Sequence, residues 1–120
     1  MFELCIKGDF CAAHLLRGYE GKCKDLHGHT WKVEVVVAGE KLNAIGMVAD
    51  FAALKKKLRD FLERIDHVYL NELPYFKDVN PTTENLARYI YTEFPKFSPG
   101  ITLKKVTVWE SDHAGATYYE

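Results

Sequence analysis

The segment His27–Gly39, HGHTWKVEVVVAG, carries the clearest secondary-structure signal in the chain. It is rich in valine and alternates in part between apolar and polar residues, which is typical of a strand with one buried face. Side chains two residues apart on a strand project to the same side. One face of the predicted strand therefore carries both histidines and the apolar residues that follow them (Trp31, Val33, Val35, Val37), and Lys32 and Glu34 lie on the other.

His27 and His29 are thus expected to project their imidazoles to one side. A first strand is predicted over residues 2–14, FELCIKGDFCAAH, where Phe10, Ala12 and His14 share one face. Antiparallel pairing of the two strands would bring His14 beside the other two histidines. Three neutral imidazoles suit zinc (Zn²⁺) and leave a fourth position open, as in catalytic zinc sites.

An HxH pattern is also compatible with ordinary surface or hydrogen-bonded histidines. The apolar context of His14, FCAAH, favours the metal site because a buried imidazole requires a partner.

Two helices are predicted between the outer strands. The first spans Phe51–Ile65, with apolar residues at three- and four-residue spacing and Asp50 as its N-cap. A long connector, DHVYLNELPYFKDVNP, follows, and its length is typical of a functional loop. The second helix is predicted over Thr83–Phe94, with its start marked by Pro81 and a buried line formed by Leu86, Ile90 and Phe94.

After a turn at FSPG (97–100), a third strand is predicted over 101–111, and GATYYE (115–120) is a short last strand or a tail. The order β-β-α-α-β-β predicts one α+β domain over residues 1–120, an antiparallel sheet covered by two helices on one face. The edges of so small a sheet need partners, so we expect a homo-oligomer.

Composition excludes several classes of function. The 16 basic and 17 acidic residues are balanced, which gives no electrostatic footprint for nucleic acid or an anionic membrane. No apolar run is long enough for a membrane span, and the N-terminus lacks a signal-peptide pattern, so a cytoplasmic location is expected. The three cysteines form no CxxC pair, which fits a reducing compartment. Cys5 and Cys11 are expected to be small buried residues of the first strand.

Cys23 differs from the other cysteines because it lies in a polar, glycine-flanked loop between Lys22 and Lys24, four residues before His27. It is the better candidate for proton transfer or nucleophilic attack.

Asp66 and His67 open the connector after the first helix. The pair either complements the end of that helix, where a histidine interacts favourably with the dipole, or forms a carboxylate-supported base. Sequence neighbours do not face each other on a regular helix or strand, so the second interpretation requires an irregular backbone.

Six stretches, FCAAH, CKDLHGH, GMVADF, DHVYLN, PTTENLARYIY and VTVWES, together resemble the 6-pyruvoyl-tetrahydropterin synthase and 6-carboxy-tetrahydropterin synthase family in order and spacing. The resemblance runs from Phe10 to Ser111. It implies the tunnelling fold (T-fold), in which the sheets of β-β-α-α-β-β subunits join into a barrel in a trimer, commonly with two trimers stacked.

The resemblance also implies roles for residues of this chain. His14, His27 and His29 would bind zinc, Cys23 would be the catalytic thiol, and Asp66 with His67 would handle its proton. Active sites of the family lie between subunits, so this pair could serve a Cys23 of another chain. The residues implied to bind the pterin are Glu110, Thr82, Thr83 and Glu84. Without the resemblance, Glu110 is an ordinary strand-end carboxylate and the other three are helix-capping residues. Most relatives carry serine where Cys11 stands, and the tail matches more loosely, so His113 is given no role.

The implied substrate is 7,8-dihydroneopterin triphosphate. The compact chain and the motif GMVADF favour the 6-carboxy branch of the family. In this branch acetaldehyde and triphosphate are lost, and the product leads to 7-deazapurines such as queuosine. The 6-pyruvoyl branch is the alternative. Two other classes stay open: a non-catalytic pterin- or purine-binding scaffold, and a zinc hydrolase on an unrelated fold. The hydrolase would need a carboxylate beside the metal-bound water, and the sequence holds no HExxH-like motif. Lys22, Lys24 and Arg17 are the candidates for holding the triphosphate.

Overall fold

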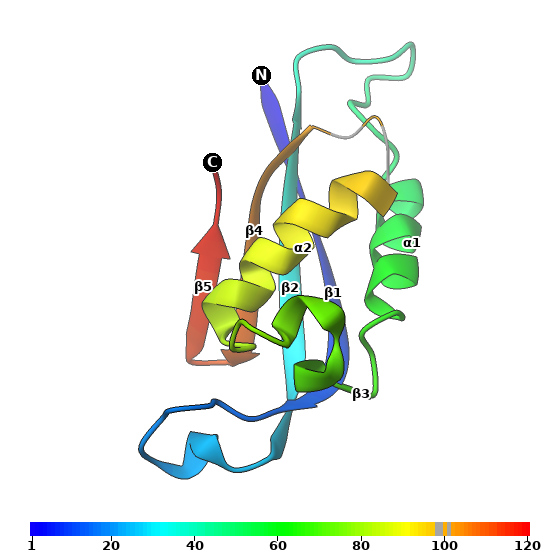
Figure 1. Ribbon diagram of the computed structural model, residues 1–120. Helices are drawn as coiled ribbons and strands as arrows, with labels where there is room; N and C mark the ends of the chain where they lie inside the picture. The colour runs from blue at the N-terminus through cyan, green and yellow to red at the C-terminus, as the bar shows by residue number, and fades with distance from the viewer. Residues whose placement is uncertain (98–99, 101) are drawn as a thin grey trace.

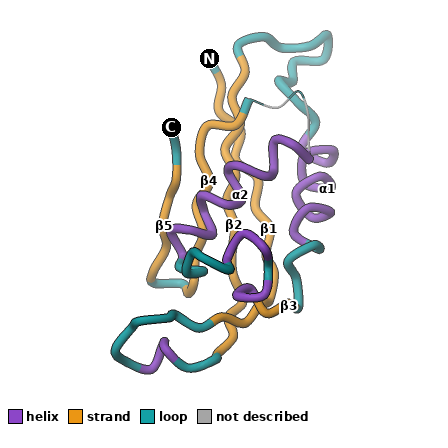
Figure 2. Tube along the Cα trace, viewed as in Figure 1, coloured by secondary structure: helices purple, strands orange, loops and turns teal. Residues whose placement is uncertain are grey.

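The computed structural model describes residues 1–97, 100 and 102–120, and in them a five-stranded sheet carries two helices on one face (Figures 1 and 2). The sheet order is β3-β1-β2-β4-β5. The strands are β1 (Phe2–His14), β2 (His27–Gly39), β3 (Val68–Tyr69), β4 (Leu103–Ser111) and β5 (Ala114–Tyr118), and the helices are α1 (Phe51–Leu62) and α2 (Thr83–Phe97). The prediction of an α+β fold with two helices on one face of the sheet is confirmed.

The pairing of β1 with β2 fixes the part of the sheet that matters for function. The two strands are antiparallel along their whole length, and His14 lies opposite His27, with Ala12 opposite His29. Because all three histidines occupy the same face as Phe10 and Trp31, they gather at one end of the sheet on its helix-covered side.

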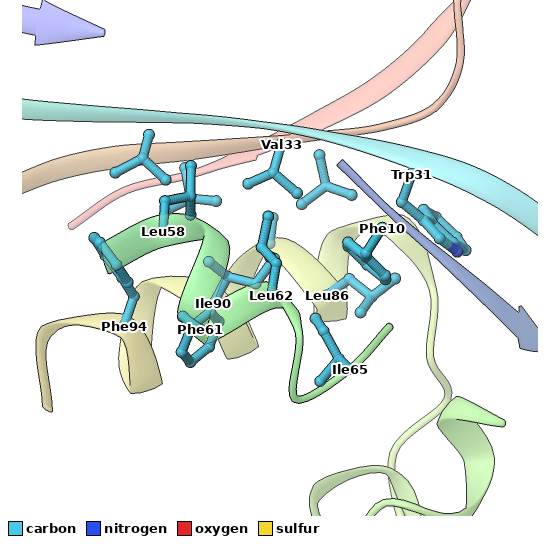
Figure 3. Packing of buried hydrophobic residues seen from close by; sticks show 14 of the residues in the cluster. Phe10, Trp31, Val33, Leu58, Phe61, Leu62, Ile65, Leu86, Ile90 and Phe94 are labelled. Atoms are coloured by element: carbon cyan, nitrogen blue, oxygen red, sulfur yellow. The ribbon is translucent and has the colours of Figure 1, made fainter. Parts of the chain in front are cut away.

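The core lies between that face and the helices (Figure 3). Helix α1 packs against β1, and α2 packs against β4 and β5. The helical spacing of the apolar residues explains the contact, since the predicted buried line of α2 (Leu86, Ile90, Phe94) is fully buried. Gly8 lets α1 approach β1 closely: a Cβ atom there would lie 2.9 Å from Leu62 Cδ1 and 3.3 Å from Leu58 Cδ2.

The helix boundaries differ from the predictions at their C-terminal ends. The Asp50 carboxylate caps α1 as predicted, accepting from the Ala52 N–H at 2.9 Å, but α1 ends at Leu62. The chain then tightens into i→i−3 hydrogen bonds that still keep Ile65 buried. Helix α2 continues through Pro95 to Phe97, beyond the predicted end at Phe94.

The connector between the helices is more ordered than its sequence indicated. It contains β3, which pairs in parallel with β1, and two short 3₁₀ helices, Leu70–Glu72 and Pro74–Phe76. The sequence had predicted a purely antiparallel sheet, and this is wrong because β3 pairs in parallel with β1. In the turn predicted at 97–100, residues 98 and 99 lie outside the described residues, as does residue 101 at the predicted start of the third strand. That strand begins at Leu103, and the short last strand is confirmed as β5.

The prediction that Cys5 and Cys11 are buried is wrong. Both are exposed, because they share their parity on β1 with Lys7 and Asp9, on the face of the sheet away from the helices. No helix in the described part of the chain is long and apolar enough to cross a membrane.

Candidate metal centre and active site

The three histidines predicted as metal ligands converge at the end of β1 and β2. Nitrogen atoms of His14, His27 and His29, together with a carboxylate oxygen of Glu110 from β4, all lie within 4.8 Å of one another. Nε2 of His14 lies 2.9 Å from Nε2 of His27, and the His29 ring centroid lies 4.8 Å from that of His27. The strand register therefore does assemble the predicted cluster.

Backbone carbonyls define which ring nitrogens carry hydrogen. His14 Nδ1 lies 2.8 Å from the Pro81 carbonyl oxygen, and His27 Nδ1 lies 2.7 Å from that of Asp25. A carbonyl only accepts, so each Nδ1 is the donor and the neutral ring keeps a lone pair on Nε2. The two Nε2 atoms therefore face each other with no hydrogen between them, an arrangement that a shared cation satisfies.

His29 and Glu110 complete the cluster. Nε2 of His29 is buried and forms no hydrogen bond with any described residue, although Glu110 Oε1 lies 3.1 Å away. The same oxygen lies 3.6 Å from His14 Nε2. A carboxylate therefore does lie beside the imidazoles, contrary to the expectation from the absence of an HExxH motif.

Burial favours the neutral form of His14 and His29. Desolvation lowers the pKa of His14 below the ordinary histidine value, and the adjacent His27 and His29 lower it further. Desolvation also lowers the pKa of His29, against the opposing influence of the Glu110 carboxylate. Neutral rings with free lone pairs are the form that binds metal. The donor set, the unpartnered nitrogen and the carbonyl-fixed tautomers together fit a divalent metal ion.

Cys23 lies outside this cluster in the long loop between β1 and β2, within the short 3₁₀ helix Lys22–Lys24. The loop extends away from the body of the sheet (Figure 1), and the cysteine is half-buried. Its carbonyl accepts a hydrogen bond from the Leu16 N–H at 2.9 Å. Of the three triphosphate candidates, Arg17 is already engaged: its guanidinium donates to the Phe76 and Val79 carbonyls at 2.7 and 3.0 Å.

Asp66 and His67 form the irregular pair that a carboxylate-supported base requires. His67 adopts a positive φ of 57°, which turns its ring back so that Nδ1 lies 2.9 Å from Asp66 Oδ2. The backbone of Cys11 binds both residues. Its N–H donates to Asp66 Oδ1 at 2.8 Å, and its carbonyl accepts from the His67 N–H at 2.5 Å. The bond from the Cys11 N–H and then that from His67 lower the pKa of Asp66, so the carboxylate stays ionised.

His67 is 79% exposed at its side chain and lines a surface pocket of about 540 Å³ with Cys11, His29 and Thr30. Among the described residues, no hydrogen bond or ion pair joins Cys23 to Asp66 or His67. One chain thus brings the histidine cluster and the Asp–His pair to the same surface pocket, through His29 and His67, while the described residues show no hydrogen bond between the thiol and that pair.

The residues predicted to bind the pterin divide between the cluster and the start of α2. Glu110 lies at the cluster, and its role as pterin anchor stays a prediction. Thr82 caps α2, with its hydroxyl accepting from the Asn85 N–H at 3.1 Å, whereas Thr83 is half-buried and Glu84 is exposed. Without the resemblance, Thr82, Thr83 and Glu84 were all predicted to be helix-capping residues, and the structure shows this role for Thr82.

The comparisons with known proteins agree with this geometry. The family model described as 6-pyruvoyl tetrahydropterin synthase matches residues 3–120. The chain belongs to the 6-pyruvoyl tetrahydropterin synthase family. The solved structure of 6-pyruvoyl tetrahydropterin synthase from Caenorhabditis elegans superposes with a TM-score of 0.87 at 30% identity, covering 99% of this chain and 95% of that one.

Relatives within the family carry different names. The human 6-pyruvoyl tetrahydrobiopterin synthase is 43% identical over 82% of this chain and 70% of its own. A dihydroneopterin monophosphate aldolase of Pyrococcus furiosus is 39% identical over 94% and 93%. A 6-carboxy-5,6,7,8-tetrahydropterin synthase of Synechocystis is 37% identical over 92% and 87%. The chain is therefore a lyase of the 6-pyruvoyl tetrahydropterin synthase family, and identity alone does not select among these reactions.

Proposed function

We propose that this chain is a zinc-dependent 6-carboxy-5,6,7,8-tetrahydropterin synthase acting on 7,8-dihydroneopterin triphosphate. The convergence of one ring nitrogen from each of His14, His27 and His29, two of these rings being in tautomers fixed by backbone carbonyls, carries the proposal. All-nitrogen donation from imidazoles is the ligand set of catalytic zinc. When bound there, the ion supplies Lewis-acid polarisation to hydroxyl oxygens of the substrate side chain.

The chain's own residues would perform the binding and the proton transfers. Glu110 accepts two parallel N–H bonds from the 2-amino-pyrimidinone edge of the pterin, and Thr83 and Glu84, at the start of α2, complete the pocket with Thr82. Since Glu110 also lies beside the three imidazoles, a pterin held by this carboxylate keeps its side chain close to the metal ligands.

Cys23 and His67 move protons on and off the side-chain carbons. Asp66 accepts from Nδ1 of His67, which leaves Nε2 free to take or deliver a proton. Because no hydrogen bond joins Cys23 to this pair among the described residues of one chain, we propose that the active site forms between subunits of a homo-oligomer, with the sheets joined into the barrel of the T-fold, as a trimer or a dimer of trimers. Triphosphate leaves by elimination, one water molecule supplies the additional oxygen atom of the carboxylate, and a carbon–carbon bond of the side chain breaks to release acetaldehyde.

Two other reactions of the same site have specific support. The 43% identity with the human protein favours 6-pyruvoyl-tetrahydropterin formation, in which triphosphate is eliminated and all side-chain carbons are retained. The match along nearly all of the Pyrococcus relative favours an aldolase, in which retro-aldol cleavage would release a two-carbon aldehyde that keeps its phosphate.

One product analysis separates the three. The purified chain is incubated with dihydroneopterin triphosphate and, separately, with the monophosphate, and aldehydes and released phosphate are quantified. We expect acetaldehyde and triphosphate in equal amounts. Triphosphate release without any aldehyde would favour the 6-pyruvoyl reaction, and a phosphorylated aldehyde would favour the aldolase.

A Cys23→Ala variant tests for a non-catalytic scaffold. It is expected to retain metal and pterin binding while turnover falls by about two to four orders of magnitude, the range for a lost acid–base group. Unchanged turnover would refute the role of the thiol. Pterin binding without turnover in the unsubstituted chain would indicate a scaffold.

A further inference from the structure

Two asparagines of the connector bind the backbone that leads from His14 towards Cys23. Asn71 accepts from the Leu15 N–H at 3.0 Å and donates to the Leu15 carbonyl at 3.0 Å. Asn80 does the same with Arg17, accepting from its N–H at 3.0 Å and donating to its carbonyl at 2.8 Å. Residues 15 to 17 follow the end of β1, and each side-chain amide satisfies the backbone N–H and C=O groups that a neighbouring strand would otherwise bind.

Leu16 lies between Leu15 and Arg17, and its backbone N–H is directed away from the two asparagines. Leu16 donates its N–H to the carbonyl of Cys23 at 2.9 Å. In an extended segment, alternate residues direct their backbone polar groups to opposite sides. Holding Leu15 and Arg17 from the connector side therefore sets the position from which Leu16 holds the thiol-bearing residue.

Asn80 is joined directly to the residue that orients a metal ligand. The Pro81 carbonyl accepts from His14 Nδ1 at 2.8 Å. Proline fixes its own φ and restricts the residue before it to extended conformations. The Asn80 carbonyl also accepts from the Asn85 side chain in the first turn of α2 at 2.9 Å. Asn80 and Pro81 consequently form one rigid unit. The Asn80 side chain binds the Arg17 backbone, and the Pro81 carbonyl binds the His14 imidazole.

We propose that Asn80 is a positioning residue that holds the Cys23 loop at a fixed place relative to the His14 imidazole, with Asn71 supporting the same segment. This inference rests on the proposed function, in which Cys23 acts on a substrate held at the metal ligands. Asn71 is buried, at 9% exposure, and among the described residues His14 is the only other buried polar one. This burial agrees with a structural role of Asn71 in the interior.

Four proteins test the proposal: the unsubstituted chain, Asn80→Ala, Asn80→Asp and the matched control Asn43→Ala. Asn43 also uses its side chain for two backbone bonds, accepting from the Ile45 and Met47 N–H groups at 3.0 Å each. It lies in the loop after β2, beyond the end opposite the histidines. Asn80→Asp keeps an acceptor for the Arg17 N–H and loses the donor to its carbonyl.

The first readout is the alkylation rate of Cys23 with iodoacetamide, measured by peptide mapping, with the exposed Cys5 as reference within each sample. Loss of two hydrogen bonds in Asn80→Ala is expected to accelerate Cys23 alkylation about tenfold relative to Cys5, with a smaller increase in Asn80→Asp and none in Asn43→Ala. The second readout is turnover: kcat falls about tenfold or more in Asn80→Ala while KM changes less than about threefold, since misplacement of a reacting group affects the chemical step.

An Asn80→Ala protein whose Cys23 alkylation and kcat match those of Asn43→Ala would overturn the proposal. If Asn80→Ala does not fold, Asn80→Asp and amide exchange of the unsubstituted chain decide: the Leu15, Leu16 and Arg17 amides are expected to exchange slowly, and rapid exchange would also overturn it. Alkylation and exchange do not require turnover, so an unsubstituted chain that is inactive on dihydroneopterin phosphates would refute the proposed function and leave these two results readable.

Discussion

Replacing His14 with asparagine is expected to remove a metal ligand while preserving the local fold. The asparagine amide N–H reaches about as far as the imidazole Nδ1, so it can still donate to the Pro81 carbonyl, now 2.8 Å from the histidine. Nothing in the shorter side chain reaches the position of Nε2. The variant therefore separates metal binding from the hydrogen bond that holds the connector to β1.

The expected loss of metal affinity is large. Removing a partner behind a metal ligand costs about 10–100-fold, so removing the ligand itself is expected to cost at least about 100-fold, or about 2.8 kcal/mol at 1.4 kcal/mol for each factor of ten. The metal-free protein behaves differently. In that protein the lone pairs on Nε2 of His14 and Nε2 of His27 face each other at 2.9 Å; the substitution removes the one on His14 and so relieves their repulsion, while the hydrogen bond to the Pro81 carbonyl remains. The free energy of unfolding of the metal-free protein should therefore change by less than about 1 kcal/mol, the value of one hydrogen bond.

The assay is competition for zinc with a chromogenic chelator, followed by urea unfolding of the fully chelated proteins. His14→Ala is the comparison, since it loses both the ligand and the hydrogen bond and should be less stable than His14→Asn by about 0.5–1.5 kcal/mol without metal. Zinc affinity of His14→Asn within about threefold of the unsubstituted chain would refute the assignment of His14 as a ligand.

Three further substitutions test other parts of the structure. Gly8→Val should lower the free energy of unfolding by about 1–3 kcal/mol, because the side chain would collide with Leu62 and Leu58 of α1; urea unfolding measures it, and an unchanged midpoint would contradict the close packing. Thr82→Ala should cost about 1 kcal/mol by removing the cap of α2, seen as a loss of helix stability in thermal melts that Thr82→Ser restores. Folding lowers the pKa of Asp66 from 3.8, so the stabilising contribution of its carboxylate is complete above that pH and is lost as the pH falls through the folded pKa. Asp66→Asn should therefore flatten the decline in the free energy of unfolding between about pH 5 and pH 2. An identical decline in both proteins would contradict a stabilising interaction of Asp66 with the Cys11 N–H and His67.

Much of the sheet and the convergence of the three histidines could be predicted from local patterns. Alternation along residues 2–14 and 27–39 placed Phe10, Trp31 and the three histidines on one face, and antiparallel pairing across the loop aligned His14 with His27. The same parity places Cys5 and Cys11 on the exposed face with Lys7 and Asp9, whereas the general tendency of cysteine to be buried predicts the opposite.

The remaining features depend on contacts between distant segments. β3 has two residues and no periodicity of its own, and it forms because β1 offers an unpaired edge. The approach of Glu110 to His29 follows from the register of β4 on β2, which no local pattern encodes. The carbonyls of Pro81 and Asp25 that fix the histidine tautomers are backbone atoms and leave no trace in residue type. The positive φ of His67 was anticipated only as a requirement for an irregular backbone.

The most direct test of the whole account is turnover of dihydroneopterin triphosphate by one preparation measured three times: as purified, after complete chelation, and after zinc is restored. We predict acetaldehyde and triphosphate release in the first and third measurements and none in the second. Turnover that continues after the metal has been removed would contradict the assignment of His14, His27 and His29 to a catalytic metal centre.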